Sequence, residues 1–360
     1  MREMYSELTT KKYSIIVPAY NAEDYLSECI ESIMTQITEE DEVIIVNDGS
    51  DDNTAAIADS YSKKYENIRV LHQENKGNAG AKNSGLKMAL GKWIMFVDAD
   101  DMLEPDCFSK INEAVDAMSE DDVLIFNFSY LFPDGRKEEE TGFENIEKYC
   151  NNSKYMFEIM PTILCCKVFS KEFLRKNEII LPEGRIYEDI AVLFKWLPFV
   201  RYIIPVNHSL YLYRQHEQST TSRRELNKLI QIIDAIEGQY LFLKDNKMLE
   251  KYRQRFESFA ITHIVTEFVP YMVMQKDGIE YAEKSMDYMH SRFKGYERNP
   301  YISGYSFRNR GYLTLCNMRF WNFLKCIIKI KAAAKRIVVK AGLVSVYNRY
   351  RIKAAGKNVR

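Results

Sequence analysis

The sequence has few residues of the kinds that mark fibrous or unfolded chains. Its 360 residues include 15 Gly and 9 Pro, without a glycine repeat or a proline-rich stretch. Hydrophobic residues make up 46% of the chain and charged residues 28%, which is enough apolar material for a packed core. Collagen-like, low-complexity and disordered proteins are therefore excluded, and the length predicts about two domains.

Long apolar runs are also missing. No stretch of 18 uncharged apolar residues occurs, and the first dozen residues, MREMYSELTTKK, lack the apolar core of a secretory signal. A membrane span and a signal peptide both need such a run. The sequence therefore predicts a cytoplasmic protein.

The seven cysteines form neither a disulfide pattern nor a zinc motif. They stand at positions 29, 107, 150, 165, 166, 316 and 326, an odd number without CxxC spacing. Disulfide frameworks and structural zinc sites need paired or clustered cysteines. We expect reduced thiols with packing roles.

Acidic residues are absent from the last part of the chain. From residue 298 to residue 360 there are 15 Lys and Arg but no Asp or Glu, so the formal net charge of −1 hides an acidic first part and a basic last part. Such asymmetry points to an anionic partner, either a membrane surface or nucleic acid.

Short apolar runs alternate with helical patterns over the first half. We expect strands near 13–18, 42–46, 68–72, 92–97 and 122–130, with amphipathic helices between the first four. This alternation predicts a parallel sheet flanked by helices, with ligands bound beyond the carboxyl ends of the strands. Because the residue pattern becomes typical of helices near residue 223, two domains are expected, 1–222 and 223–360.

Polar residues follow the expected strands. Asp48, in VNDGS, could accept a hydrogen bond from a nucleobase or a ribose, or serve as a helix cap. The loop 74–83 combines glycines, amides and Lys82, which suits a phosphate. The first strand is not followed by GxGxxG, and the string from Gly85 to Lys92 has the wrong spacing for a Walker motif. NAD enzymes and P-loop NTPases are thereby disfavoured.

Three carboxylates follow the strand WIMFV, at Asp98, Asp100 and Asp101. Mg²⁺ or Mn²⁺ binds one or two carboxylates and leaves positions for phosphate, which suits a diphosphate substrate. The alternative is a solvated acidic turn in which Asp101 caps the next helix.

Two further motifs carry candidate chemistry. Glu188 and Asp189 precede the apolar run IAVLFKWL, where one could be a general base or both could be favourable charges at a helix start. Arg214 with Ser219 and Thr220 could clamp a diphosphate. His216 is either a metal ligand or a surface histidine.

Six segments occur in an order typical of one enzyme family: SIIVPAYNAEDYL, VNDGSDDNT, ENKGNAGAKNSGL, FVDADD, YEDIAVLF and YLYRQHEQSTT. Over residues 1–222 they resemble the family 2 glycosyltransferases, inverting enzymes of bacterial capsule, exopolysaccharide and teichoic-acid pathways. The resemblance implies the GT-A fold, a Rossmann-like, mostly parallel sheet flanked by helices, followed here by a mainly α-helical C-terminal region.

The resemblance also assigns roles by position. The implied donor-binding residues are Pro18, Tyr20, Asp48, Asn75, Lys82, Asp98, Asp100, Arg214 and Ser219. A uridine would be surrounded by Pro18, Tyr20, Asp48 and Asn75, and Lys82 would lie near the nucleotide. Asp98 would contact the ribose, Asp100 would bind Mn²⁺ or Mg²⁺, and Arg214 with Ser219 would cover the diphosphate. Asn47 replaces a frequent Asp and Lys82 a usual Arg, which leaves the contact of Lys82 open.

The implied reaction is a single displacement from a nucleotide sugar, with a UDP-sugar favoured. Asp189 would take the proton of an acceptor hydroxyl on a glycan or lipid-linked saccharide, and the anomeric configuration would invert. A nucleotidyltransferase would need a glycine-rich, Arg-containing loop where this chain has AYNAEDY. A non-catalytic nucleotide- or glycan-binding relative that scaffolds a polysaccharide-synthesis complex stays the alternative. A homo-oligomer is compatible with the sequence.

Residues 321–347 are predicted to form a basic amphipathic helix. Four cations fall on one stripe, at Lys325, Lys329, Arg336 and Lys340, and the apolar residues Ile327, Ile330, Ile337 and Val338 lie opposite. This pattern favours an in-plane helix on an anionic membrane surface, at the inner face of the cell membrane. The alternatives are docking on an acidic protein face and, least favoured, nucleic acid.

Overall fold

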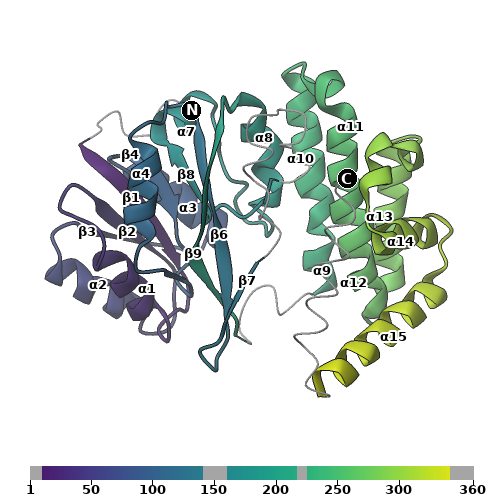
Figure 1. Ribbon diagram of the computed structural model, residues 1–360, viewed down its shortest axis with the longest axis horizontal. Helices are drawn as coiled ribbons and strands as arrows, with labels where there is room; N and C mark the ends of the chain where they lie inside the picture. The colour runs from purple at the N-terminus through teal and green to yellow at the C-terminus, as the bar shows by residue number, and fades with distance from the viewer. Residues whose placement is uncertain (1–9, 141–159, 217–224, 341–360) are drawn as a thin grey trace. The chain divides into compact units, whose positions relative to one another are not determined.

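The structure, a computed structural model, describes residues 10–140, 160–216 and 225–340, the last six by backbone only (Figure 1). It divides into two compact units, Met1–Arg223 and Arg224–Arg360. The first is built on a sheet and the second is helical. The six described cysteines are free thiols, five buried and Cys326 exposed.

A nine-stranded mixed sheet forms the centre of the first unit. The strand order is β3-β2-β1-β4-β8-β6-β9-β5, with β7 paired to β6. The strands are β1 (Lys11–Ala19), β2 (Glu42–Asp48), β3 (Ile68–Gln73), β4 (Gly91–Phe96), β5 (Met102–Leu103), β6 (Val123–Leu131), β7 (Lys137–Glu139), β8 (Lys167–Ser170) and β9 (Ile203–Arg214). The expected α/β fold class is confirmed.

The first four strands of this order are parallel, as expected. β1 pairs with β2 and β4, and β2 pairs with β3. β2 is buried along its whole length, because helices cover both faces of a parallel sheet. The chain reverses its direction of winding between β3 and β4, so that β4 lies on the other side of β1. Such a reversal is where open sheets bind ligands.

The other half of the sheet departs from the expected mostly parallel arrangement. β8 is antiparallel to both β4 and β6, β5 is antiparallel to β9, and only β6 and β9 pair in parallel. Neither β8 nor β9 was expected from the sequence. The turn around Pro133 to Gly135 connects the antiparallel strands β6 and β7.

The helices of the first unit are short. They are α1 (Leu26–Met34), α2 (Thr54–Lys64), α3 (Gly77–Met88), α4 (Cys107–Val115), α7 (Lys171–Lys176), α8 (Leu193–Trp196) and the 3₁₀ turns η3 (Ile190–Val192) and η4 (Leu197–Phe199). Right-handed crossovers put α1 and α2 on one face of the parallel strands. α3 packs on β1 and β2 and follows the reversal, so it covers the other face.

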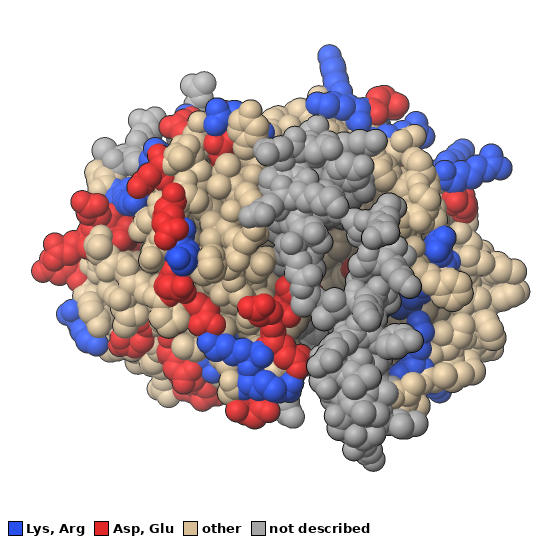
Figure 2. All heavy atoms as spheres, in the orientation of Figure 1, with Lys and Arg blue, Asp and Glu red and all other residues tan. Residues whose placement is uncertain are grey.

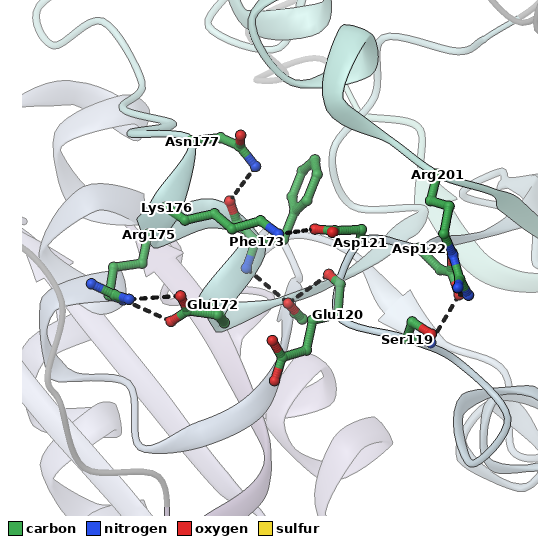
Figure 3. A network of polar contacts seen from close by, with 11 residues as sticks. Ser119, Glu120, Asp121, Asp122, Glu172, Phe173, Arg175, Lys176, Asn177 and Arg201 are labelled. Carbon is green, nitrogen blue, oxygen red and sulfur yellow. Dashed lines mark hydrogen bonds and ion pairs between the residues drawn. The ribbon is translucent and has the colours of Figure 1, made fainter.

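A polar network fastens the end of the sheet where β6 begins (Figure 3). Asp122 accepts two hydrogen bonds from the Arg201 guanidinium, at 2.9 and 2.8 Å, and Asp121 pairs with Lys176. The Ser170 hydroxyl donates to the Glu120 carbonyl at 2.8 Å. Because β6 runs away from this network, the network lies at the opposite end from the polar residues that follow the parallel strands, and its role is structural.

The second unit is helical, as predicted. Its helices are α9 (Leu226–Leu229), α10 (Gln231–Asp245), α11 (Leu249–Ala260), the π-helix η5 (Ile261–Phe268), α12 (Val269–Met274), α13 (Gly278–Arg292), η6 (Tyr296–Arg298), η7 (Pro300–Gly304), α14 (Phe307–Asn317) and α15 (Trp321–Lys340). Phe256, Met272, Met286 and Leu324 are part of its core. In the described parts of the chain, no helix has the length and hydropathy that crossing a membrane requires.

Candidate active site

Three loops at the carboxyl ends of β1, β2 and β3 are joined by hydrogen bonds. Asn21, with a positive φ of 48°, donates its backbone N–H to Ser50 Oγ (3.0 Å) and accepts from the Asp51 N–H (2.9 Å). Gly49 has a φ of 72°, and a Cβ there would stand 2.9 Å from the Asn75 nitrogen. Only glycine permits this close approach of the second and third loops.

Asp48 connects the second and third loops directly. Its Oδ1 accepts from Gln73 Nε2 at 2.7 Å and from the Lys76 N–H at 2.9 Å, and the residue is buried. It is therefore not a cap for α2. Asn75 lies exposed beside it, Pro18 is buried in β1, and Tyr20 is 51% exposed just after β1.

The acidic turn after β4 is held against β9. β5 follows Asp101 directly and pairs with β9 through Met102 to Leu212 and Leu103 to Tyr211. This pairing brings Arg214 beside the turn, where its N–H donates to Asp101 Oδ1 at 2.8 Å. A pairing of two residues thus joins two motifs that are more than a hundred positions apart.

Asp101 is buried and supports the acidic turn, so it is not the solvated helix cap of the alternative interpretation. It is 1% exposed, and its carboxylate accepts a hydrogen bond from the Tyr211 hydroxyl at 2.5 Å. The same hydroxyl accepts the Asp98 N–H at 3.2 Å. Burial and the charges of Asp100 and Asp98 raise the pKa of Asp101 well above its usual value. The alternative interpretation of Asp101 is therefore wrong.

Asp98 lies between a cation and a thiol. Burial opposes its ionisation, but the Lys82 charge and a hydrogen bond from Cys165 outweigh that and lower the pKa of Asp98. Lys82 Nζ stands 3.2 Å from Oδ1 and Cys165 Sγ donates to Oδ2 at 3.2 Å. Asp98 is therefore ionised at neutral pH.

Asp100 and His216 form a neighbouring pair. His216 Nε2 lies 2.9 Å from Asp100 Oδ2, and the His216 side chain is 12% exposed, so it is not a surface histidine. Its ring contacts Tyr25 at 4.7 Å between centroids. Burial and the Asp98 charge raise the pKa of Asp100, which favours a positive partner at this place.

Arg214 spans the acidic turn and helix α1. Its Nε donates to the Asp100 carbonyl at 2.9 Å and an Nη2 donates to Glu28 at 2.5 Å. Its guanidinium carbon also stands 5.2 Å from the centre of the Tyr25 ring. The guanidinium is thus fixed beside Asp100, with its side chain 18% exposed.

Lys82 joins the acidic turn to the second acidic motif. Its Nζ lies 3.1 Å from Glu188 Oε1 as well as 3.2 Å from Asp98, and it is 2% exposed. Glu188 Oε1 also accepts from Asn78 Nδ2 at 3.0 Å. A buried cation between two carboxylates offsets the cost of burying either charge. The predicted proximity of Lys82 to a nucleotide stays a prediction.

Asp189 caps η3 and has an altered pKa. Its Oδ1 accepts the Ile190 N–H at 2.7 Å. Burial, with the adjacent Glu188 charge, raises the pKa of Asp189 to about 6. Tyr187, just before this motif, has a φ of 65°, a strained conformation for a bulky residue and one that clusters at functional sites.

The predicted residues therefore form two groups connected by Lys82. One group contains Asp98, Asp100, Arg214 and His216, and the other contains Glu188 and Asp189. Asp48 and Asn75 lie on the loops that follow the neighbouring strands. Ser219 and Thr220 lie outside the described residues.

Several supporting residues escaped the sequence analysis. They are Tyr25, Glu28, Asn78, Cys165 and Tyr211. Asn78 stands in a loop already singled out, and Tyr211 stands three positions before Arg214, so nearness to a motif was the available signal. Glu28 and Cys165 had none, because their partners are distant in sequence.

Among the described residues, no group of three or more His, Cys, Asp or Glu side chains is placed so that it could hold a metal ion. The Asp98 and Asp100 carboxylates with the His216 imidazole are nevertheless donors that Mg²⁺ or Mn²⁺ accepts. The buried Oδ1 of Asp98 accepts no hydrogen bond, although Lys82 lies beside it. These residues fit an ion whose remaining ligands come from a phosphate.

Comparison with known proteins agrees with this geometry. The family profile described as Glycosyl transferase family 2 matches residues 14–177. EpsH of Bacillus subtilis (strain 168), named as a glycosyltransferase, is 30% identical over 264 residues, 71% of this chain and 76% of that protein. The poly(ribitol-phosphate) beta-glucosyltransferase of Bacillus spizizenii is 33% identical over 183 residues, 48% of this chain and 27% of that protein.

A solved structure has the same fold. The crystal structure of S. aureus TarS residues 1–349 in complex with UDP-GlcNAc is similar, with a TM-score of 0.66 and 22% identity, over 89% of this chain and 92% of that one. This likeness confirms the GT-A arrangement of the sheet. From the extent of its match to EpsH, together with the family profile, the chain belongs to glycosyltransferase family 2.

Proposed function

We propose that this glycosyltransferase moves a sugar, with inversion, from a UDP-sugar to a hydroxyl group of a cell-surface polymer or its lipid-linked precursor. The observation that carries the proposal is Lys82, which connects the donor-side carboxylate Asp98 to the Glu188–Asp189 motif. Leaving-group chemistry and proton removal then occur in one polar site.

The donor is assigned to the loops after β1, β2 and β3. The Asp48 carboxylate and the Asn75 amide offer acceptors and a donor for a base or ribose, with Pro18 and Tyr20 at the neighbouring loop. The TarS neighbour was solved with UDP-GlcNAc, which supports a UDP-sugar and, more specifically, an N-acetylhexosamine donor. Hexosyl transfer is the competing assignment, supported by the glucosyltransferase relative.

We further propose that Asp98, Asp100 and His216 hold Mn²⁺ or Mg²⁺ with the diphosphate. When bound, the ion would neutralise negative charge on the leaving diphosphate. Arg214 lies beside Asp100 and supplies a fixed positive charge at the same place. Ser219 is assigned to the same diphosphate by its position in the motif.

Asp189 is the proposed general base. Its raised pKa makes it a stronger base than an ordinary aspartate while it stays largely ionised at neutral pH. As the acceptor oxygen bonds to the anomeric carbon, the bond from that carbon to the diphosphate breaks and the hydroxyl proton passes to Asp189. Glu188, held by Lys82 and Asn78, keeps this segment in position.

The remaining assignments concern the whole chain. We propose that residues 1–222 form the transferase domain and residues 223–360 a helical domain that places the enzyme at the inner face of the cell membrane. Cell-surface polymers such as poly(ribitol phosphate), the substrate in the name of one relative, are the proposed class of acceptor. A non-catalytic scaffold is the competing hypothesis.

Release of UDP from UDP-sugars tests the proposal. Wild type with Mn²⁺ or Mg²⁺ should hydrolyse one donor slowly, and Asp100→Ala should abolish this. Asp106→Asn changes an exposed aspartate that makes no cap hydrogen bond and should behave as wild type. Binding of UDP without turnover of any nucleotide sugar, with or without acceptor, would instead support the scaffold.

A further inference from the structure

Large apolar side chains gather on the surface of α14 and α15. Nine large hydrophobic residues are exposed in the described chain, and five of them fall between positions 307 and 330. They are Phe307 (87% exposed), Met318 (54%), Phe320 (50%), Phe323 (59%) and Ile330 (62%). Soluble surfaces expose single apolar residues, whereas a gathering of this kind marks an interaction site.

The helix α15 packs on its unit by a different set of residues. Trp321 and Leu324 are buried, and Trp321 Nε1 donates to Glu283 at 2.5 Å. Phe323 and Ile330 are seven positions apart, two helical turns, so they lie on one face. That face is exposed. The second unit therefore uses the first turn of α15 for docking and leaves the apolar stripe of this helix open.

Cations accompany these apolar residues. Lys329 is exposed on one flank of the stripe, about 100° around the helix from Ile330. Lys331 Nζ lies 5.2 Å from the ring centre of Tyr312 on α14. Partial burial, together with the charge of Arg308, lowers the pKa of Lys331. The cations of both helices thus act on one another.

Acidic side chains that could neutralise this face are scarce. The sequence has no Asp or Glu after position 297. Glu283 and Asp287 pair with Arg319, which lies between α14 and α15. In Figure 2, red spheres gather over the first unit, while the lower right part of this face is tan and blue. The exposed face is therefore both apolar and cationic.

We propose that this face, defined by Phe307, Met318, Phe320, Phe323 and Ile330 and flanked by the cations Arg308, Lys329 and Lys331, binds the surface of an anionic phospholipid bilayer. Aromatic and aliphatic side chains enter the boundary of the acyl chains, and the cations meet the phosphates. The proposal rests on the membrane position proposed above and specifies its contact surface.

Other occupants fit the face less well. A second copy of the chain in a two-fold contact would bring like-charged lysines together. Nucleic acid would satisfy the cations through its phosphates but offers no apolar layer for Met318 and Ile330. An anionic leaflet supplies both components.

Co-sedimentation of the full chain with vesicles tests the proposal. Vesicles of phosphatidylglycerol and phosphatidylcholine should bind it, and pure phosphatidylcholine should bind far less. The double variant Phe323→Ser, Ile330→Ser should bind about tenfold more weakly. Leu241→Ser, at a 44% exposed position on α10, is the matched control and should bind as wild type.

The charge contribution is tested separately. Changing Lys329 and Lys331 to Gln should weaken binding about 25-fold at low salt, because each cation near such a surface adds about a fivefold factor. The control changes two exposed lysines elsewhere in the unit to Gln, namely Lys244 and Lys276.

Three results would overturn the proposal: equal binding to neutral vesicles, full binding by both α15 variants, or tighter binding to a single-stranded oligonucleotide than to vesicles. Concentration-dependent self-association without lipid, lost in the Phe323→Ser, Ile330→Ser variant, would assign the face to a second copy. Thermal melts check folding. UDP release without vesicles should match wild type in every variant, so failure of the lipid proposal is distinct from failure of the catalytic one.

Discussion

Asp189 experiences two opposing influences on its ionisation. The Ile190 N–H stabilises its charged form, whereas burial and the neighbouring Glu188 disfavour it, and the net pKa is about 6. If this carboxylate removes the acceptor proton, the rate should be constant above about pH 7. Below pH 6 it should fall with increasing protonation of Asp189.

The pH dependence of kcat with donor and acceptor measures this. Asp189→Asn should lower kcat by about 10² to 10⁴-fold and abolish the limb near pH 6. Asp106→Asn should keep both the rate and the limb. An unchanged acidic limb in Asp189→Asn would assign the titration to another group and reject this base.

Lys82 provides a test of the connection between the two acidic motifs. Lys82→Met leaves two carboxylates near each other without their buried cation, so the free energy of unfolding at pH 7.5 should fall by about 3 to 5 kcal/mol. Lys87→Met, at an exposed position on the same helix, should change it by less than about 0.5 kcal/mol. Denaturant unfolding measures both. Equal stability of Lys82→Met and wild type would contradict the proposed connection.

The chemical type of the site could be predicted at this scale, but the contacts between its residues could not. Asp98, Asp100 and Arg214 were recognisable because each follows a strand or stands in a dense motif. The burial of Lys82 between Asp98 and Glu188 depends on a residue more than a hundred positions away. A lysine at a phosphate-like loop has the same local signal whether it faces a ligand or a carboxylate.

At the scale of elements, strands could be predicted where neighbours in sequence are neighbours in space. β1, β2, β3 and β4 follow from apolar runs separated by helices, with boundaries at most two residues off. β8 has four residues, and β9 contains Pro205 and exposed polar positions. Their partners are chosen by long-range pairing, which periodicity does not encode.

The pairing of β5 with β9 leads us to predict an effect of removing the Tyr211 hydroxyl. Tyr211, on β9, donates to the buried Asp101 and accepts from the Asp98 N–H. Tyr211→Phe removes that hydroxyl and should cost about 1 to 3 kcal/mol of stability. It should also raise the KM for the nucleotide sugar, because the acidic turn loses its support. Tyr202→Phe, at a 48% exposed position, should leave both unchanged.

Steady-state kinetics and denaturant unfolding give the two readouts for Tyr211→Phe. A loss of stability with an unchanged KM would mean that the hydroxyl supports the fold alone. The position of the acidic turn depends on this strand pairing. Because β5 starts directly after Asp101, its pairing with β9 holds the turn against β9.

At the scale of the whole molecule, the stretch without Asp or Glu, from residue 298 onward, lies entirely within the second unit. The first unit contains the candidate site, and the second contains the basic face of α14 and α15. If the proposed domain roles hold, nucleotide binding stabilises the first unit only. At a hundred times its Kd, UDP adds about 2.7 kcal/mol to the unit that binds it, which raises the Tm of a domain of this size by about 5 to 10 °C.

Differential scanning calorimetry of the full chain with and without UDP and Mn²⁺ measures this. We expect two transitions, of which one moves with UDP. Asp48→Ala should reduce that movement, because the Asp48 carboxylate is in the proposed nucleoside site, while Asp106→Asn keeps it. Equal movement of both transitions would show that the second unit is coupled energetically to the donor site, and a single transition would show that the two units unfold as one body.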